Sequence, residues 1–138
     1  RVDPDNPVVR LCGEGMMAEG DGRPDDAKQL FERAWEIRRD AFDASVAAHY
    51  LARHQASLES VLQWNQTALD EALLVSDGRE GDLLPSLHLN LGKSFEDLGR
   101  MPEARRHYQL AEAAVSALHD DGYGQMLRRG IAAGLART

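Results

Sequence analysis

Three positions, occupied mostly by small residues, recur along this chain with a fixed spacing. The first step is 34 residues for all three positions, and the second step is 43 residues for all three. The positions are Gly15, Ala27 and Ala34, then His49, Val61 and Ala68, then Gly92, Ala104 and Ala111. Positions that shift together indicate a repeated structural unit, and this period is typical of stacked helical pairs. The spacing therefore predicts an all-α fold of units that bury their apolar faces against one another.

Apolar residues recur at helical spacing between polar breaks rich in glycine and proline. The segment from Ala27 to Ile37 carries apolar residues at i, i+3, i+4 and i+7, which is typical of an amphipathic helix. Ser57 is placed as an N-cap, and Pro85 is expected to open the fifth helix. We expect one domain over residues 1–138 with seven helices. These form three hairpins, at about residues 8–39, 42–76 and 85–118, and a capping helix at about 123–136.

The middle unit is the irregular one. We expect an extended helix from about Leu58 to Val75 and a polar loop at residues 77–82 to absorb the longer second step. The same unit has His49 where the other units have glycine, and Asn65 where they have an aromatic residue. The middle unit is therefore the first place to look for what is particular to this protein.

Composition excludes several classes of partner. The net charge of −7 argues against nucleic acid and against an anionic membrane surface. Cys12 is the only cysteine and cannot form an internal disulfide, which favours a cytoplasmic location. The chain has no apolar run long enough for a membrane span. Lys28 and Lys93 are the only lysines among 16 basic residues, a bias typical of a GC-rich, bacterial genome.

The sequence carries no motif typical of catalysis, metal binding or nucleotide binding. His49 and His54 are five residues apart, which is the wrong spacing for two zinc ligands on one helix. No GxxxxGK[ST], HExxH or GxSxG motif is present. We therefore expect a non-catalytic domain that uses no metal and no cofactor.

The hairpins resemble the tetratricopeptide repeat (TPR). The third hairpin matches most closely, through Leu91, Gly92, Phe95, Leu98, Gly99, Ala104, Tyr108 and Ala111. The first keeps Gly15, Gly22, Ala27, Phe31 and Ala34, whereas the second departs at His49, Val61 and Asn65. The resemblance covers about residues 7–118. It implies a right-handed α-solenoid whose function is to bind another protein.

In the TPR family the concave wall is lined by the first helix of each pair. The resemblance implies a groove for an extended or helical peptide, in which Tyr50 stacks and Arg53 or Lys93 pairs with a carboxylate. Arg128 of the closing helix is a further candidate. The residues placed on this wall are Val9, Cys12, Met16, Asp43, Val46, Ala47, Tyr50, Arg53, Ser86, Leu89, Asn90, Lys93 and Asp97.

Three functions stay open at this point. The first is an adaptor that binds a peptide of another protein in the concave groove. The second is a homodimerisation module, because three hairpins make a short stack whose edges can pair. The third is a helical sensor or regulatory domain of a larger protein, which agrees with a chain that begins at Arg1 rather than methionine. An enzyme is the least expected, because no nucleophile, base and acid converge in the sequence.

Overall fold

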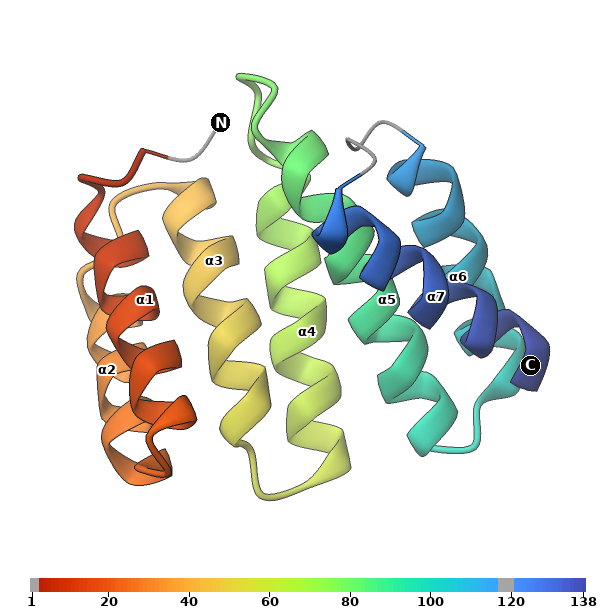
Figure 1. Ribbon diagram of the computed structural model, residues 1–138, viewed down its shortest axis with the longest axis horizontal. Helices are drawn as coiled ribbons and strands as arrows, with labels where there is room; N and C mark the ends of the chain where they lie inside the picture. The colour runs from red at the N-terminus through yellow and green to blue at the C-terminus, as the bar shows by residue number, and fades with distance from the viewer. Residues whose placement is uncertain (1–2, 117–120) are drawn as a thin grey trace.

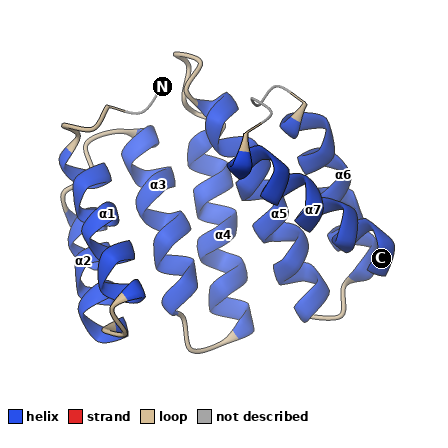
Figure 2. Cartoon of the chain, viewed as in Figure 1, coloured by secondary structure: helices blue, strands red, loops and turns tan. Residues whose placement is uncertain are grey.

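The structure, a computed structural model, describes residues 3–116 and 121–138. Within these residues the chain forms seven α-helices and no strand, which confirms the predicted all-α class (Figures 1 and 2). The expected end of the third hairpin, Leu118, lies outside the described residues. The helices are α1 Pro7–Gly20, α2 Pro24–Glu36, α3 Ala41–Leu51, α4 Leu58–Ala72, α5 Glu80–Asp97, α6 Met101–Val115 and α7 Gly122–Arg137, with a short 3₁₀ helix at Ala52–His54 after α3.

Local signals in the sequence set most of the helix starts. The hydroxyl of Ser57 accepts a hydrogen bond from the backbone N–H of Ser60, as the sequence predicts for an N-cap. The side chains of Asn6, Asp40 and Asp121 cap α1, α3 and α7 in the same way. Proline stands in the first turn of α1, α2 and α6, where its missing N–H costs no helical hydrogen bond.

The predicted start of the fifth helix is wrong, and the fourth helix ends slightly earlier than expected. Helix α4 ends at Ala72 rather than Val75, and Leu73 and Leu74 beyond it are 62% and 69% exposed. Helix α5 begins at Glu80, so Pro85 lies inside the helix and part of the expected polar loop is helical. Leu83 and Leu84 pack against the core cluster around Leu91, and their burial favours helix on the N-terminal side of the proline.

The helices pack in chain order as antiparallel neighbours (Figure 1). Helices α1 and α2, α3 and α4, and α5 and α6 pair as hairpins, and α2–α3 and α4–α5 contacts join them. Helix α7 packs on both α5 and α6, and its Leu127 and Ile131 are buried against Ala111 and Val115. The last helix therefore covers the apolar side of the third hairpin.

An aromatic ring fills the space above a glycine in the first and third hairpins. A Cβ atom at Gly15 would lie 2.2 Å from the ring of Phe31, and one at Gly92 would lie 2.6 Å from the ring of Tyr108. Tyr108 also packs against Gly134 of α7 in the same close manner. Both rings are fully buried. Glycine is required at these positions because any side chain would collide with the ring.

The middle hairpin has a polar arrangement at the same two repeat positions. Asn65 on α4 stands at the aromatic position, and its amide nitrogen donates to the hydroxyl of Ser94 on α5 at 2.9 Å. His49 on α3 stands at the glycine position, and its Nδ1 lies 3.1 Å from the amide nitrogen of Asn90 on α5. Two polar bridges to α5 thus replace the packed ring.

Candidate functional site

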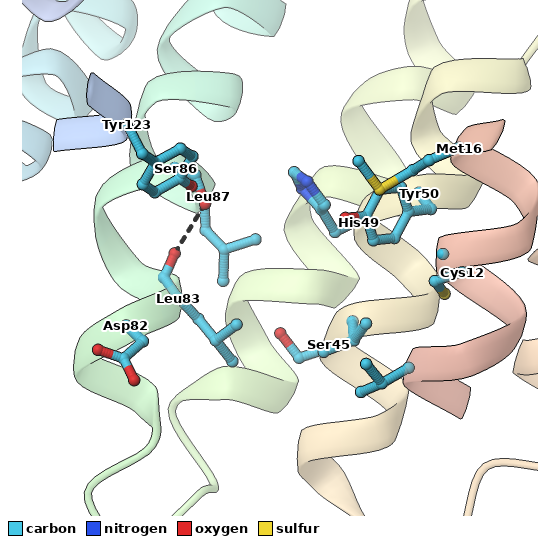
Figure 3. A pocket seen from close by; sticks show the side chains of 13 residues that line it. Cys12, Met16, Ser45, His49, Tyr50, Asp82, Leu83, Ser86, Leu87 and Tyr123 are labelled. Carbon is cyan, nitrogen blue, oxygen red and sulfur yellow. Dashed lines mark hydrogen bonds between the residues drawn. The ribbon is translucent and has the colours of Figure 1, made fainter. Parts of the chain in front are cut away.

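The first cavity of the site opens between α3 and α5, which both pack on α4. It has a volume of about 260 Å³, and we call it the apolar cavity. In Figure 3 Leu83, Ser86 and Leu87 of α5 face Met16 of α1 and His49 and Tyr50 of α3 across the opening, with Tyr123 of α7 at one end. The full lining is Val9, Cys12, Gly13, Met16, Ser45, Val46, His49, Tyr50, Asp82, Leu83, Ser86, Leu87 and Tyr123.

Two hydroxyl groups in the lining of the apolar cavity, those of Ser45 and Ser86, are satisfied within the protein. The hydroxyl of Ser45, which is fully buried, donates to the backbone carbonyl of Ala68 on α4 at 2.7 Å. The hydroxyl of Ser86 donates to the carbonyl of Leu83 at 3.1 Å, as the dashed line in Figure 3 shows. Because both hydroxyl protons are already donated, this part of the lining favours an apolar group.

The rim of the apolar cavity is aromatic on the α1–α3 side. Tyr50 stacks on the ring of Phe31 with 5.1 Å between ring centroids, which fixes α3 against the first hairpin. Burial raises the pKa of the Tyr50 hydroxyl, so it stays protonated at neutral pH. Met16 and Tyr123, on opposite sides, are 46% and 50% exposed and present apolar surface to solvent at the mouth.

A second cavity, which we call the polar cavity, adjoins the first and has a volume of about 310 Å³. It lies where Asn65 stands in place of the aromatic ring of the outer hairpins. Its charged groups are paired: Lys93 Nζ is 2.9 Å from Asp97 Oδ1, and Arg53 Nη2 is 2.9 Å from Glu19 Oε1. The lining is His49, Ala52, Arg53, Val61, Asn65, Asn90, Lys93, Ser94 and Asp97.

His49 lines both cavities, so it forms the wall between them. The amide nitrogen of Asn90 can only donate, so His49 Nδ1 is the acceptor of the hydrogen bond between them. A neutral ring that accepts at Nδ1 carries its proton on Nε2. Burial, helped by the positive charge of Arg53, lowers the pKa of His49 to about 4. The imidazole is therefore neutral at neutral pH, with its N–H at Nε2.

The thiol in the apolar cavity is not activated. Burial, together with the negative charge of Asp43, raises the pKa of Cys12 to about 12. A thiol with such a pKa is protonated at neutral pH and is a poor nucleophile. Cys12 therefore contributes a small apolar surface to the cavity wall.

The structure brings most of the predicted groove residues together. Met16, Val46 and Tyr50 line the apolar cavity, with Val9, Cys12 and Ser86 beside them. Asn90, Lys93, Asp97 and Arg53 line the polar cavity. Sequence reasoning marked His49 and Asn65 as departures from the repeat but gave them no place in the groove. Their departure from the repeat was the available sequence signal for the site, because His49 lines both cavities and Asn65 lines the polar cavity.

Asp43, however, does not lie where the sequence analysis expects it. Its carboxylate is fully buried and accepts hydrogen bonds from the Asn6 amide at 2.7 Å and from Arg39 Nε at 3.0 Å. Burial acts to raise its pKa, but these hydrogen bonds outweigh burial and lower it. Asp43 therefore ties the start of α1 to the loop before α3, which is a structural role.

Leu89 and Arg128 also lie away from the two cavities. Leu89 packs against the cluster of Ala111, Val115, Leu127 and Ile131 beside α7. Arg128 Nη2 donates to the backbone carbonyl of Val115 on α6 at 3.2 Å. Leu89 was expected on the groove because the resemblance places the first helix of each hairpin on the concave wall. Arg128 was expected there from a register of the closing helix that the sequence does not determine.

Among residues 3–116 and 121–138, no group of three or more His, Cys, Asp or Glu side chains is arranged to hold a metal ion. No helix in the same residues is long and apolar enough to cross a bilayer. Comparison of the chain with protein-family models, with curated proteins and with solved structures found no match.

Proposed function

We propose that this chain is a non-catalytic, TPR-like interaction domain that binds a peptide segment of another protein across the two cavities. A right-handed α-solenoid of three hairpins with α7 as its cap is part of the proposal. It is supported by the shared packing of Gly15 with Phe31 and of Gly92 with Tyr108, which stand at equivalent repeat positions.

The observation that carries the proposal is the adjacency of an apolar and a polar cavity that meet at His49. A peptide offers an apolar side chain and polar main-chain groups a few ångströms apart, which suits such a pair. Apolar walls supply most of the affinity, and a few placed polar groups fix the orientation. In this proposal Met16, Val46 and Tyr50 contact the side chain, and Asn65 and Asn90 contact amide groups.

The ionisable groups of the two cavities favour binding over catalysis. A general base works best with a pKa near the operating pH, whereas burial lowers the pKa of His49 to about 4. The raised pKa of Cys12 likewise disfavours a nucleophile. Lys93 and Arg53 each have a carboxylate partner within 3 Å, so a ligand carboxylate would have to compete for them.

The proposal is tested with peptides selected from a random library on the intact chain. Gly13 lines the apolar cavity, and a Cβ there would meet no atom within 4 Å. Gly13→Trp should therefore fill the cavity without a collision, and Gly13→Ala is the matched control. We expect about tenfold or greater weakening by Gly13→Trp, since a buried apolar side chain contributes about 1.5–3 kcal/mol.

Fluorescence polarisation gives the dissociation constants, and the melting temperatures show that both variants are folded. Lys93→Glu tests the polar cavity in the same assay, with weaker binding expected for peptides that place an acidic group there. Peptides that bind Gly13→Trp as tightly as the unaltered chain would place the binding surface elsewhere.

Self-association is the second candidate, and one observation favours it. Leu73 and Leu74 follow α4 and are 62% and 69% exposed, so the part of the chain that the structure describes leaves this apolar surface uncovered. Light scattering at micromolar concentration should then show a dimer that Leu74→Glu converts to a monomer. A monomer for the unaltered chain would remove this candidate.

A further inference from the structure

His49 holds a hydrogen-bond donor without a partner at the wall between the two cavities. Its Nδ1 accepts from Asn90, and the described residues place no acceptor on its Nε2–H. His49 is half-buried, and its Nε2 keeps contact with solvent. The Nε2–H of His49 is therefore a donor on this wall that a ligand acceptor can meet by replacing water.

The orientation of the His49 ring is set on two sides. The hydrogen bond from Asn90 holds it toward α5, and Tyr50 packs edge-on against it with 4.9 Å between ring centroids. Figure 3 shows the ring of His49 directed from α3 into the gap that Leu87 faces from α5. A donor that is oriented before binding loses little further freedom when a ligand arrives.

The surroundings of His49 select the kind of acceptor. The ring is neutral and Asp82 lines the same cavity, so an anionic ligand gains no charge attraction there. The hydroxyl protons of Ser45 and Ser86 are already donated within the protein, so this lining favours an apolar group. A neutral carbonyl oxygen next to an apolar group meets both conditions.

We propose that the ligand in the apolar cavity presents a carbonyl oxygen to His49 Nε2–H, and that Asn90 is the positioning residue that fixes this tautomer. The inference rests on the proposed function, in which that carbonyl belongs to the peptide main chain beside the apolar anchor. It assigns His49 as a specificity-determining residue and gives a physical reason for histidine at a repeat position that is glycine in the outer hairpins.

Two small probes of the same shape test the hydrogen bond. Acetophenone carries a carbonyl group next to a ring, and ethylbenzene is its nearly isosteric hydrocarbon. Dissociation constants of both come from NMR titration of the isotope-labelled full chain. In His49→Phe the preference for acetophenone relative to ethylbenzene should fall by about two- to tenfold, the effect of one hydrogen bond. His88→Phe, a histidine outside both cavities, should leave the ratio unchanged.

A second measurement needs no ligand and no variant. Long-range proton–nitrogen spectra of the imidazoles should show His49 with its proton on Nε2, and Asn90→Leu should weaken that preference. A His49 ring protonated on Nδ1 in the unaltered chain would overturn the inference, even if His49→Phe fails to fold.

The outcomes separate this inference from the proposed function. If both probes bind at the apolar cavity with the same ratio in the unaltered chain and in His49→Phe, the carbonyl inference is wrong and the binding site stands. If neither probe shifts resonances of the apolar cavity, the cavity is not a binding site and both are wrong.

Discussion

The outer hairpins and the middle hairpin differ in what fills the space at the same two repeat positions. In the outer hairpins a buried ring lies on a glycine, as Phe31 does on Gly15 and Tyr108 on Gly92. In the middle hairpin His49 and Asn65 stand at those positions, and both make hydrogen bonds to α5. In each outer hairpin the ring fills the space, whereas the middle hairpin leaves two cavities that are both lined by His49.

The glycine and ring pairs of the outer hairpins stabilise the fold, whereas His49 and Asn65 of the middle hairpin line the proposed site. A buried aromatic ring contributes several kcal/mol through apolar burial, whereas a neutral hydrogen bond contributes about 0.5–1.5 kcal/mol net. The middle hairpin lacks the stabilisation of a buried ring at this position, but the polar groups that bridge α3 and α4 to α5 are hydrogen-bonded. The packed hairpins on both sides keep α3 and α5 in place around the opening.

The largest expected effect is the loss of an outer ring. Phe31→Ala should destabilise the chain by about 3–5 kcal/mol, because it removes a fully buried ring and leaves a cavity. Asn65→Ala, at the equivalent middle position, should cost only about 1–2 kcal/mol through its hydrogen bond to Ser94. Urea unfolding followed by circular dichroism measures both. Equal losses of stability would mean that the first and middle hairpins do not differ in packing at this position.

Two glycines on α1 should respond with opposite signs to the same substitution. Gly15→Ala forces a methyl group into the Phe31 ring and should cost about 1–2 kcal/mol net, because overpacking exceeds the gain in helix propensity. Gly13→Ala enters open space and should stabilise the chain by about 0.5–1 kcal/mol. The midpoints of urea unfolding decide the signs, and a stabilising Gly15→Ala would contradict the close packing.

A double-mutant cycle tests whether the middle hairpin can take the glycine and ring pair of the outer hairpins. Asn65→Phe alone should collide with the His49 side chain, and His49→Gly alone should leave a gap in α3. Together they recreate the glycine and ring pair, so the double variant should be more stable than the sum of the single effects by about 1 kcal/mol. Additive free energies of unfolding would show that the two positions do not face each other as Gly15 and Phe31 do.

The smallest effect concerns pH. Burial lowers the pKa of His49 to about 4, with help from the charge of Arg53, and lowers that of His88 to about 4, with help from His107. Between their ordinary pKa near 6.5 and the lowered values, the unfolded chain binds protons that the folded chain does not. Stability should therefore fall as pH falls through this window, by about 1 kcal/mol for each ring between about pH 7 and pH 5.5.

His49→Gln removes the contribution of the middle hairpin to this pH dependence. His88→Gln removes the contribution of the third hairpin. Each variant should show a shallower loss of stability from about pH 7 to pH 5 in urea unfolding at fixed ionic strength. An unchanged slope in His49→Gln would mean that this ring is protonated in the folded chain as readily as in the unfolded chain.

Local features made much of the fold predictable from the sequence. The all-α class followed from periodicity, and the cap at Ser57 followed from a residue type that satisfies free N–H groups at a helix start. The bounds of α4 and α5 were not predictable in this way. Pro85 is a local signal for a helix start, but the burial of Leu83 and Leu84 against the distant core extends the helix beyond it.

The sequence by itself determined the repeat, the helices and the two positions where the middle unit departs from its neighbours. Only the tertiary structure decided what those departures do. Whether His49 and Asn65 pack, bridge or open a cavity depends on Asn90 and Ser94, which lie 41 and 29 residues further along the chain. Periodicity records the face on which a side chain lies, but the distance between α3 and α5 is set by how both helices pack on α4.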